Sequence, residues 1–199
     1  NVFDFKKNYM KQNILPAIRL TIVCILFFCG IYSLLILGIA QAAPAHGKGE
    51  TISVNNRVVG YKLIGQKFTD DKYFNGRPSA ADYNAMASAG SNKGPSDSAY
   101  LKIVQSRIDS FLVHNPGIKK DEIPSDLITA SGSGLDPDIS VQAANVQIMR
   151  ISKLRNISEE KLSALVDKHI EKPLGGFLGP EKINVLELNI DLNKITNKR

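Results

Sequence analysis

Cysteine and histidine are scarce in this chain of 199 residues. The two cysteines, Cys24 and Cys29, both lie in one apolar segment, so the rest of the sequence holds neither a disulfide nor a metal site built on cysteine. No two of the three histidines have the spacing of zinc ligands: His46, His114 and His169. The sequence therefore predicts no metal centre.

Three motifs that mark hydrolases and nucleotide-binding proteins are also missing. Ser133 lies in the run Ser131-Gly132-Ser133-Gly134 without a glycine two positions before it, so the serine elbow GxSxG does not occur. The same run lacks the GK[ST] ending of a phosphate-binding loop and does not fit GxGxxG. Turn rules instead favour a tight glycine turn that leads to a capped helix. No catalytic residue is predicted.

Asp136 and Asp138 flank Pro137 just beyond this turn. Two carboxylates so placed can ligate a cation. In turns, however, such side chains more often accept hydrogen bonds from nearby backbone N–H groups, and this is the interpretation that the turn chemistry favours.

Positive charge is concentrated at the N-terminus. The first 19 residues contain Lys6, Lys7, Lys11 and Arg19 against the single Asp4, so the residues that follow carry only +3 of the net charge of +6. Nucleic-acid binding needs a clustered basic face, and no such cluster follows in the sequence. We expect no nucleic-acid partner.

The most apolar segment of the sequence is Leu20–Ala40. Its 21 residues include no charge, Asn, Gln or Pro. As a helix it is about 31 Å long, which matches the ~30 Å hydrocarbon core of a bilayer. We predict a transmembrane helix in which the small residues Gly30, Ser33 and Gly38 form a packing face toward a partner helix.

The flanking charges predict the orientation of this helix. Four basic residues precede it and the next follows only at Lys48, so the positive-inside rule places residues 1–19 as a cytoplasmic tail. Residues 41–50 are then a linker, and residues 51–199 an extracytoplasmic (periplasmic) domain on a single-pass protein of the plasma (inner) membrane. The alternative is a signal peptide cleaved at Ala40-Gln41-Ala42, although signal cores run about 7–15 residues.

Residues 51–199 are predicted to form one mixed α/β (α+β) domain. Ile52 and Val54 pair across an Asn55-Asn56 turn with a strand over Arg57–Ile64, and the strict alternation of Leu186–Leu192 predicts another strand. A long loop covers Gly65–Pro95. Helices are expected over Ser96–His114, over Ser140–Arg155 and from Ser158. Their buried faces are predicted as Leu101, Val104, Ile108, Phe111 and Leu112; Val141, Ala144, Ile148, Ile151 and Leu154; and Leu162, Leu165 and Val166.

Aromatic residues and one arginine are scattered through the long loop. Phe68, Tyr73, Phe74 and Arg77 are of the types enriched in binding hot spots, which makes them candidates for a docking surface. The alternative is a satellite hydrophobic cluster beneath the loop.

Several long irregular motifs occur in order along the chain. With the basic N-terminus and the single apolar helix, they make nearly the whole sequence resemble the C subunit of the bacterial Kdp-type potassium-transporting P-type ATPase. The motifs are LIGQKF (63–68), YFNGRPSA (73–80), SAGSNKGPS (88–96), TASGSGLDP (129–137) and VLELN (185–189).

The resemblance implies a non-catalytic accessory subunit of an ATP-driven, high-affinity K⁺ import complex. Its partners would be a channel-like K⁺-selecting subunit, a P-type catalytic subunit on which ATP and Mg act, and the lipid bilayer. The chain has no DKTG phosphorylation motif, which agrees with a role outside catalysis. On the outer face, such a subunit would stabilise the assembly and shape K⁺ access.

The family also implies an alternative, in which the subunit binds nucleotide and raises the ATP affinity of the catalytic subunit. The contacts would then be Ser131, Gly132, Ser133, Gly134 and Gln147. The positive-inside rule argues against this role, because it places the glycine run outside the cell, where ATP is scarce.

Overall fold

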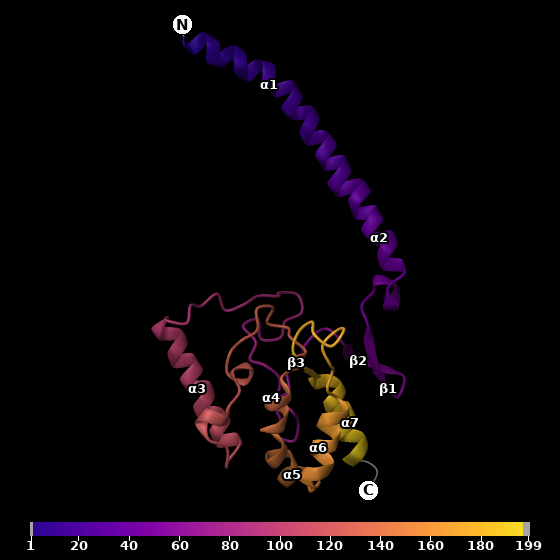
Figure 1. The fold of residues 1–199 in the computed structure, drawn as a ribbon, viewed down its shortest axis with the longest axis vertical. Helices are drawn as coiled ribbons and strands as arrows, with labels where there is room; N and C mark the ends of the chain where they lie inside the picture. The colour runs from indigo at the N-terminus through magenta and orange to yellow at the C-terminus, as the bar shows by residue number, and fades with distance from the viewer. Residues whose placement is uncertain (1, 197–199) are drawn as a thin grey trace. The chain divides into compact units, whose positions relative to one another are not determined.

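The structure is a computed structural model that describes residues 2–196, in two compact units that divide between Gly49 and Glu50. The first unit is one long helix made of α1 (Val2–Ile25), a π-helical stretch (Leu26–Tyr32) and α2 (Ser33–Gln41), as Figure 1 shows. Within it, Gln12–Gln41 (30 residues) contains an 18-residue window with a mean hydropathy of 2.8 and is long and apolar enough to cross a membrane. The predicted apolar helix is confirmed, and the helix extends upstream through the basic segment.

The π-helical stretch widens the helix inside the apolar segment. Ser33 Oγ donates to the carbonyl of Phe28, five residues earlier, at 3.2 Å. A short 3₁₀ turn (Pro44–Gly47) then follows α2.

The second unit begins with a β-hairpin of β1 (Thr51–Val54) and β2 (Arg57–Tyr61). Asn55 and Asn56 connect the strands with φ angles of 51° and 62°, as a two-residue turn of type I′ requires. The hairpin was predicted correctly, although β2 ends at Tyr61 rather than Ile64. The segment from Gly65 to Pro95 then contains neither helix nor strand, as expected for the long loop.

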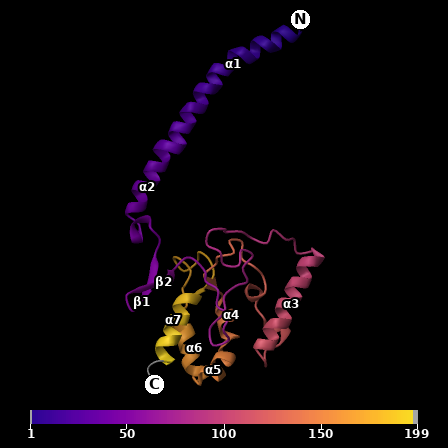
Figure 2. The ribbon, with the colours of Figure 1, turned by 180° about the vertical axis from the view of Figure 1, so that it is seen from behind.

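Helix α3 (Ser98–His114) confirms the helix predicted over Ser96–His114, but it begins two residues later, after the N-cap Asp97. Asp97 Oδ1 accepts hydrogen bonds from the backbone N–H groups of Ala99 and Tyr100 at 2.8 and 3.2 Å. Ile108 is buried, but Leu101 is 52% exposed, so its predicted place on the inner face is wrong. Figures 1 and 2 show α3 on the side of the domain away from α6 and α7.

Short elements and helices α4 to α7 complete the domain. The region predicted as one helix over residues 140–155 is two helices, separated by Val146 and Gln147, and Leu154 is 48% exposed rather than buried. Ser140 caps α4 as expected, because its Oγ accepts from Ala143 N at 3.0 Å. The elements are 3₁₀ turns at Lys120–Glu122 and Ser125–Leu127, β3 (Asp138–Ile139), α4 (Val141–Asn145), α5 (Ile148–Arg155), α6 (Glu159–Lys168), β4 (Ile183–Asn184) and α7 (Val185–Thr196).

The strand predicted over Leu186–Leu192 is wrong, because these residues belong to α7. Val185, Leu188 and Leu192 are buried at the spacing of one helix face. Asn184 starts the helix by accepting a hydrogen bond from Glu187 N at 3.1 Å.

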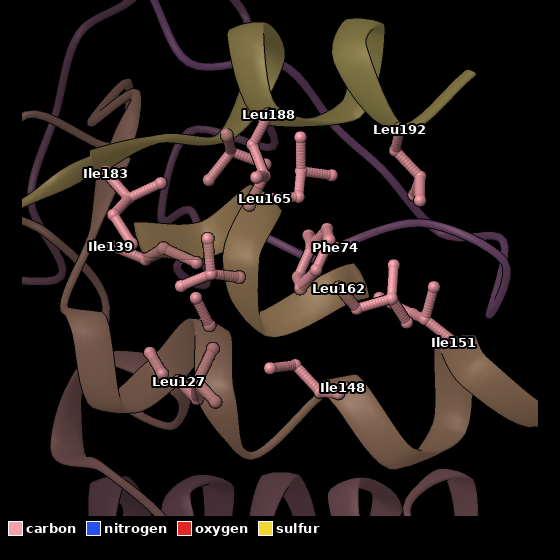
Figure 3. Close-up of a cluster of buried hydrophobic side chains, with 14 of the residues drawn as sticks. Phe74, Leu127, Ile139, Ile148, Ile151, Leu162, Leu165, Ile183, Leu188 and Leu192 are labelled. Atoms are coloured by element: carbon pink, nitrogen blue, oxygen red, sulfur yellow. The ribbon is translucent and has the colours of Figure 1, made fainter. Parts of the chain in front are cut away.

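The core of the second unit lies between these helices and the long loop. Phe74 from the loop is fully buried among side chains of α5, α6 and α7, including Ile151, Leu162 and Leu188 (Figure 3). The two described sheets are both small antiparallel pairs, β1 with β2 and β3 with β4. A mixed α/β domain after one apolar helix was the predicted fold class, and it is confirmed.

Candidate functional site

The recognisable loop motifs meet in one structure, which we call the loop platform (residues 65–97 and 129–138). Figure 1 shows much of it at one end of the second unit. Four hydrogen bonds to backbone carbonyls of the second segment join it to the first: Gly65 N to Leu135 O at 2.8 Å, Ala89 N and Ser88 Oγ to Ser133 O, both at 3.0 Å, and Ser79 Oγ to Gly134 O at 2.6 Å.

The Ser131–Gly134 run is a closed turn within this platform. Ser131 Oγ accepts from Gly134 N at 3.0 Å, and Ser133 Oγ accepts from Leu135 N at 3.1 Å. In a phosphate-binding loop such backbone N–H groups would point at the ligand. Here the serine side chains occupy the N–H groups of Gly134 and Leu135, and the predicted glycine turn is confirmed.

Replacing either of two glycines in this turn by alanine should change the stability of the domain by very different amounts. Gly134 has φ +67°, and a Cβ added there would lie 2.6 Å from the carbonyl oxygen of Ala89, whereas a Cβ on Gly132 would meet nothing within 4 Å. We expect Gly134→Ala to lower the free energy of unfolding by about 2–3 kcal/mol and Gly132→Ala to change it little. Chemical denaturation of the two variants measures this. Equal effects would contradict the packing role of Gly134.

Gln147, the fifth candidate nucleotide contact, is fully buried beneath the platform. Its Oε1 accepts from Asn75 N at 2.8 Å and from Arg150 Nη2 at 2.7 Å. Its Nε2 donates to the carbonyls of Asn75 and Ala143 at 3.2 and 3.0 Å. An amide side chain has two donor hydrogens and two acceptor lone pairs, so Gln147 has no hydrogen-bonding capacity left for a ligand.

Arg150 of α5 is the centre of the polar network that holds the platform on the core. Its side chain is 3% exposed, and burial lowers the pKa of the guanidinium although Asp71 and Asp70 act to raise it. Sequence reasoning missed this residue. Its partners are Asn115 Oδ1 at 2.9 Å, Asn75 Oδ1 at 2.9 Å, Gln147 Oε1 at 2.7 Å, the carbonyl of Tyr73 at 3.2 Å, and the carbonyl and carboxylate of Asp71.

The candidate docking residues of the long loop occupy different environments. Phe74 is 0% exposed, and its backbone N–H and carbonyl both pair with the Asn189 side chain at 2.9 Å, so it is a core residue and its assignment to a docking surface is wrong. Tyr73 is half-buried between Phe68, with ring centroids 5.9 Å apart, and the Arg155 guanidinium, 4.6 Å from its ring centre. Only Phe68, Tyr73 and Arg77 keep some exposed surface.

The two turn carboxylates are paired with basic side chains. Arg77 Nη1 lies 3.0 Å from Asp136 Oδ2, while Asp136 Oδ1 accepts from Asp138 N at 3.1 Å, the turn-capping role predicted for it. Asp138 accepts from Lys182, and this hydrogen bond raises the pKa of the lysine. Burial beside Asp136 raises the pKa of Tyr83 to about 12. Arg77, both carboxylates and Lys182 line a cleft of about 460 Å³.

The chain is similar to a known protein family and to several named proteins. A family model described as "K+-transporting ATPase, c chain" matches residues 14–194. A relative in Flavobacterium psychrophilum, named potassium-transporting ATPase KdpC subunit, is 54% identical over 184 residues, which cover 92% of this chain and 99% of the relative. Proteins of the same name in Phocaeicola vulgatus and Bacillus mycoides are 49% and 47% identical, covering 92% and 93% of this chain and 98% and 97% of theirs.

Proposed function

Because the chain belongs to the KdpC family, the c chains of K⁺-transporting ATPases, we propose that it is the non-catalytic, membrane-anchored accessory subunit of such a complex. Leu20–Ala40 crosses the membrane, and residues 51–199 lie on the outer face. There the domain stabilises the assembly of a K⁺-selecting subunit with a P-type catalytic subunit and shapes the access of K⁺. The resemblance inferred from the loop motifs is confirmed by the family match.

The observation that carries the proposal is one apolar helix with basic residues on one side only. Lys6, Lys7, Lys11 and Arg19 precede it, and the first basic residue beyond it is Lys48. Basic residues next to a membrane helix stay on the cytoplasmic side, whereas long domains are translocated largely regardless of their charge, so the second unit is the part that is exported.

A nucleotide-binding role receives little support from the geometry of its candidate residues. The serines of the Ser131–Gly134 turn are bonded to the backbone of that turn, and Gln147 is saturated with protein partners. An effect of this subunit on ATP affinity would then be transmitted through subunit contacts.

The contacts in the membrane are proposed to use the small residues of the helix. An added Cβ at Gly30 or Gly38 would meet no atom of this chain within 4 Å, so each position leaves room for the close approach of a neighbouring helix. Ser33 lies between them with its hydroxyl bonded to the Phe28 carbonyl. Phe68, Tyr73 and Arg77 are the corresponding candidates on the domain.

The test is assembly of the complex with Gly38→Leu. A Cβ at Gly38 meets no other atom of the isolated chain within 4 Å, so the leucine variant should insert into the membrane normally. In a pull-down it should recover at least about fivefold less of the other subunits, as expected when a close helix contact is lost. Ile39→Phe is the matched control, because Ile39 lies about 100° around an α-helix from Gly38 and about 120° from Ser33. Full assembly with Gly38→Leu would contradict the proposed packing face.

A further inference from the structure

A small apolar hairpin (residues 171–182) projects from the second unit between α6 and β4. Its base is closed by two backbone hydrogen bonds between Glu171 and Lys182, and its tip by two more between Leu174 and Leu178. Three large apolar side chains nevertheless lie in solvent: Leu174 is 78% exposed, Phe177 79% and Leu178 57%.

The chemistry of the tip suits lipid better than a protein partner. Residues 173–180, PLGGFLGP, contain no charged side chain and no side-chain hydrogen-bond donor or acceptor, although protein docking sites normally combine apolar anchors with such groups. Its paired backbone groups can leave water without losing their partners, as an interfacial segment requires. The charged residues that flank it, Glu171, Lys172, Glu181 and Lys182, cancel.

Contacts inside the second unit connect this hairpin to the place where the chain arrives from the membrane segment. Lys62 N donates to the carbonyl of Glu50, the first residue of the unit, at 2.9 Å. The carbonyl of Lys62 accepts from Asn184 Nδ2 at 2.8 Å, two residues beyond the hairpin base. Nine residues, 42–50, separate α2 from β1, and they reach at most about 32 Å. The bilayer is therefore within reach of the hairpin.

We propose that the hairpin is a second membrane contact, in which Leu174, Phe177 and Leu178 enter the boundary between lipid headgroups and acyl chains. The inference goes beyond the proposed function and rests on its membrane anchor alone. The inference does not depend on which side of the bilayer the domain lies. Because the contact consists of buried apolar side chains, it should be insensitive to lipid charge. The domain is thereby fixed at two points rather than hanging from one linker.

The test uses the full chain in phosphatidylcholine vesicles that contain a nitroxide-labelled lipid as a fluorescence quencher. With Cys24 and Cys29 replaced by alanine, a fluorophore is attached at Leu174→Cys or, as the matched control, at Val113→Cys. Val113 is also 78% exposed but lies at the end of α3. A third sample retains Cys29 and reports on the anchor itself.

We expect the lipid quencher to act on the probes at positions 29 and 174 but not on the probe at 113. Phe177→Ser with Leu178→Ser should weaken the lipid-bound state at position 174 by roughly tenfold or more, since each apolar side chain returned to water contributes about that factor. Vesicles with anionic lipid should give the same result.

Three other results would overturn the inference. If the probe at 29 is quenched and the probe at 174 is not, the helix is in the membrane but the hairpin does not contact lipid. If the probe at 29 is not quenched, both the membrane anchor and the hairpin contact are rejected. Protection of the 174 probe only when the other subunits are present, without lipid quenching, assigns the hairpin to a protein interface instead.

Discussion

Arg150→Met should destabilise the second unit by about 3–5 kcal/mol, a large part of the 5–15 kcal/mol that typically holds a domain folded. Methionine fills much of the space but donates no hydrogen bond. The loss leaves the carbonyl of Tyr73 and the side-chain oxygens of Asn75 and Asn115 buried without this donor. The platform should detach from α5 first. Denaturation followed by tyrosine fluorescence measures the change, because the chain has no tryptophan.

The matched control is Lys153→Met on the same helix. Lys153 is exposed, and surface substitutions of this kind usually change stability by less than about 0.5 kcal/mol. If Arg150→Met were as stable as Lys153→Met, the guanidinium would not be what holds the platform in place.

Phe74→Ala should cost about 3–5 kcal/mol, because it removes a fully buried ring from the centre of the core (Figure 3). The backbone of Phe74 would stay tied to Asn189 through both of its hydrogen bonds, so the cavity cannot close by a shift of the loop. Loss of stability with intact assembly of the refolded complex is the expected pattern, measured by denaturation and pull-down.

Met86→Ala serves as the control for this substitution, since Met86 is in the same long loop and is 96% exposed. A Phe74→Ala variant that kept its stability but failed to bind the other subunits would return Phe74 to the docking surface and contradict its place in the core.

Local signals in the sequence predicted the elements that local chemistry determines. The Asn55-Asn56 turn and the helix starts at Ser140 and Ser158 were read from residue type alone, and the start of α3 was placed within two residues. Helix α7 was missed because Leu186, Leu188, Ile190 and Leu192 alternate as in a strand. The helix signal was nevertheless present, since Asn184 followed by Glu187 three residues later is the pattern of a capping box.

The candidate site was predictable only in its motifs. The order of the loop segments pointed to the family, but no local pattern indicated which loop residue enters the core. Phe74 and Tyr73 are adjacent aromatics, and long-range contacts, such as the pairing of Asn189 with the Phe74 backbone, accompany the burial of the Phe74 ring. The available signal for the buried network was a pair of polar residues three positions apart, Gln147 and Arg150, beside the apolar stripe of the helix predicted over residues 140–155.

The central claim is that the domain and the basic N-terminal segment lie on opposite sides of the membrane. In a chain with Cys24 and Cys29 replaced by alanine, Met86→Cys offers a thiol on the domain and Lys7→Cys one in the basic segment that precedes Leu20–Ala40. Treating intact cells with a membrane-impermeant maleimide should label the thiol at 86, while the thiol at 7 should react only after lysis. Labelling at 7 in intact cells, with 86 reacting only after lysis, would place the domain in the cytoplasm and contradict the account.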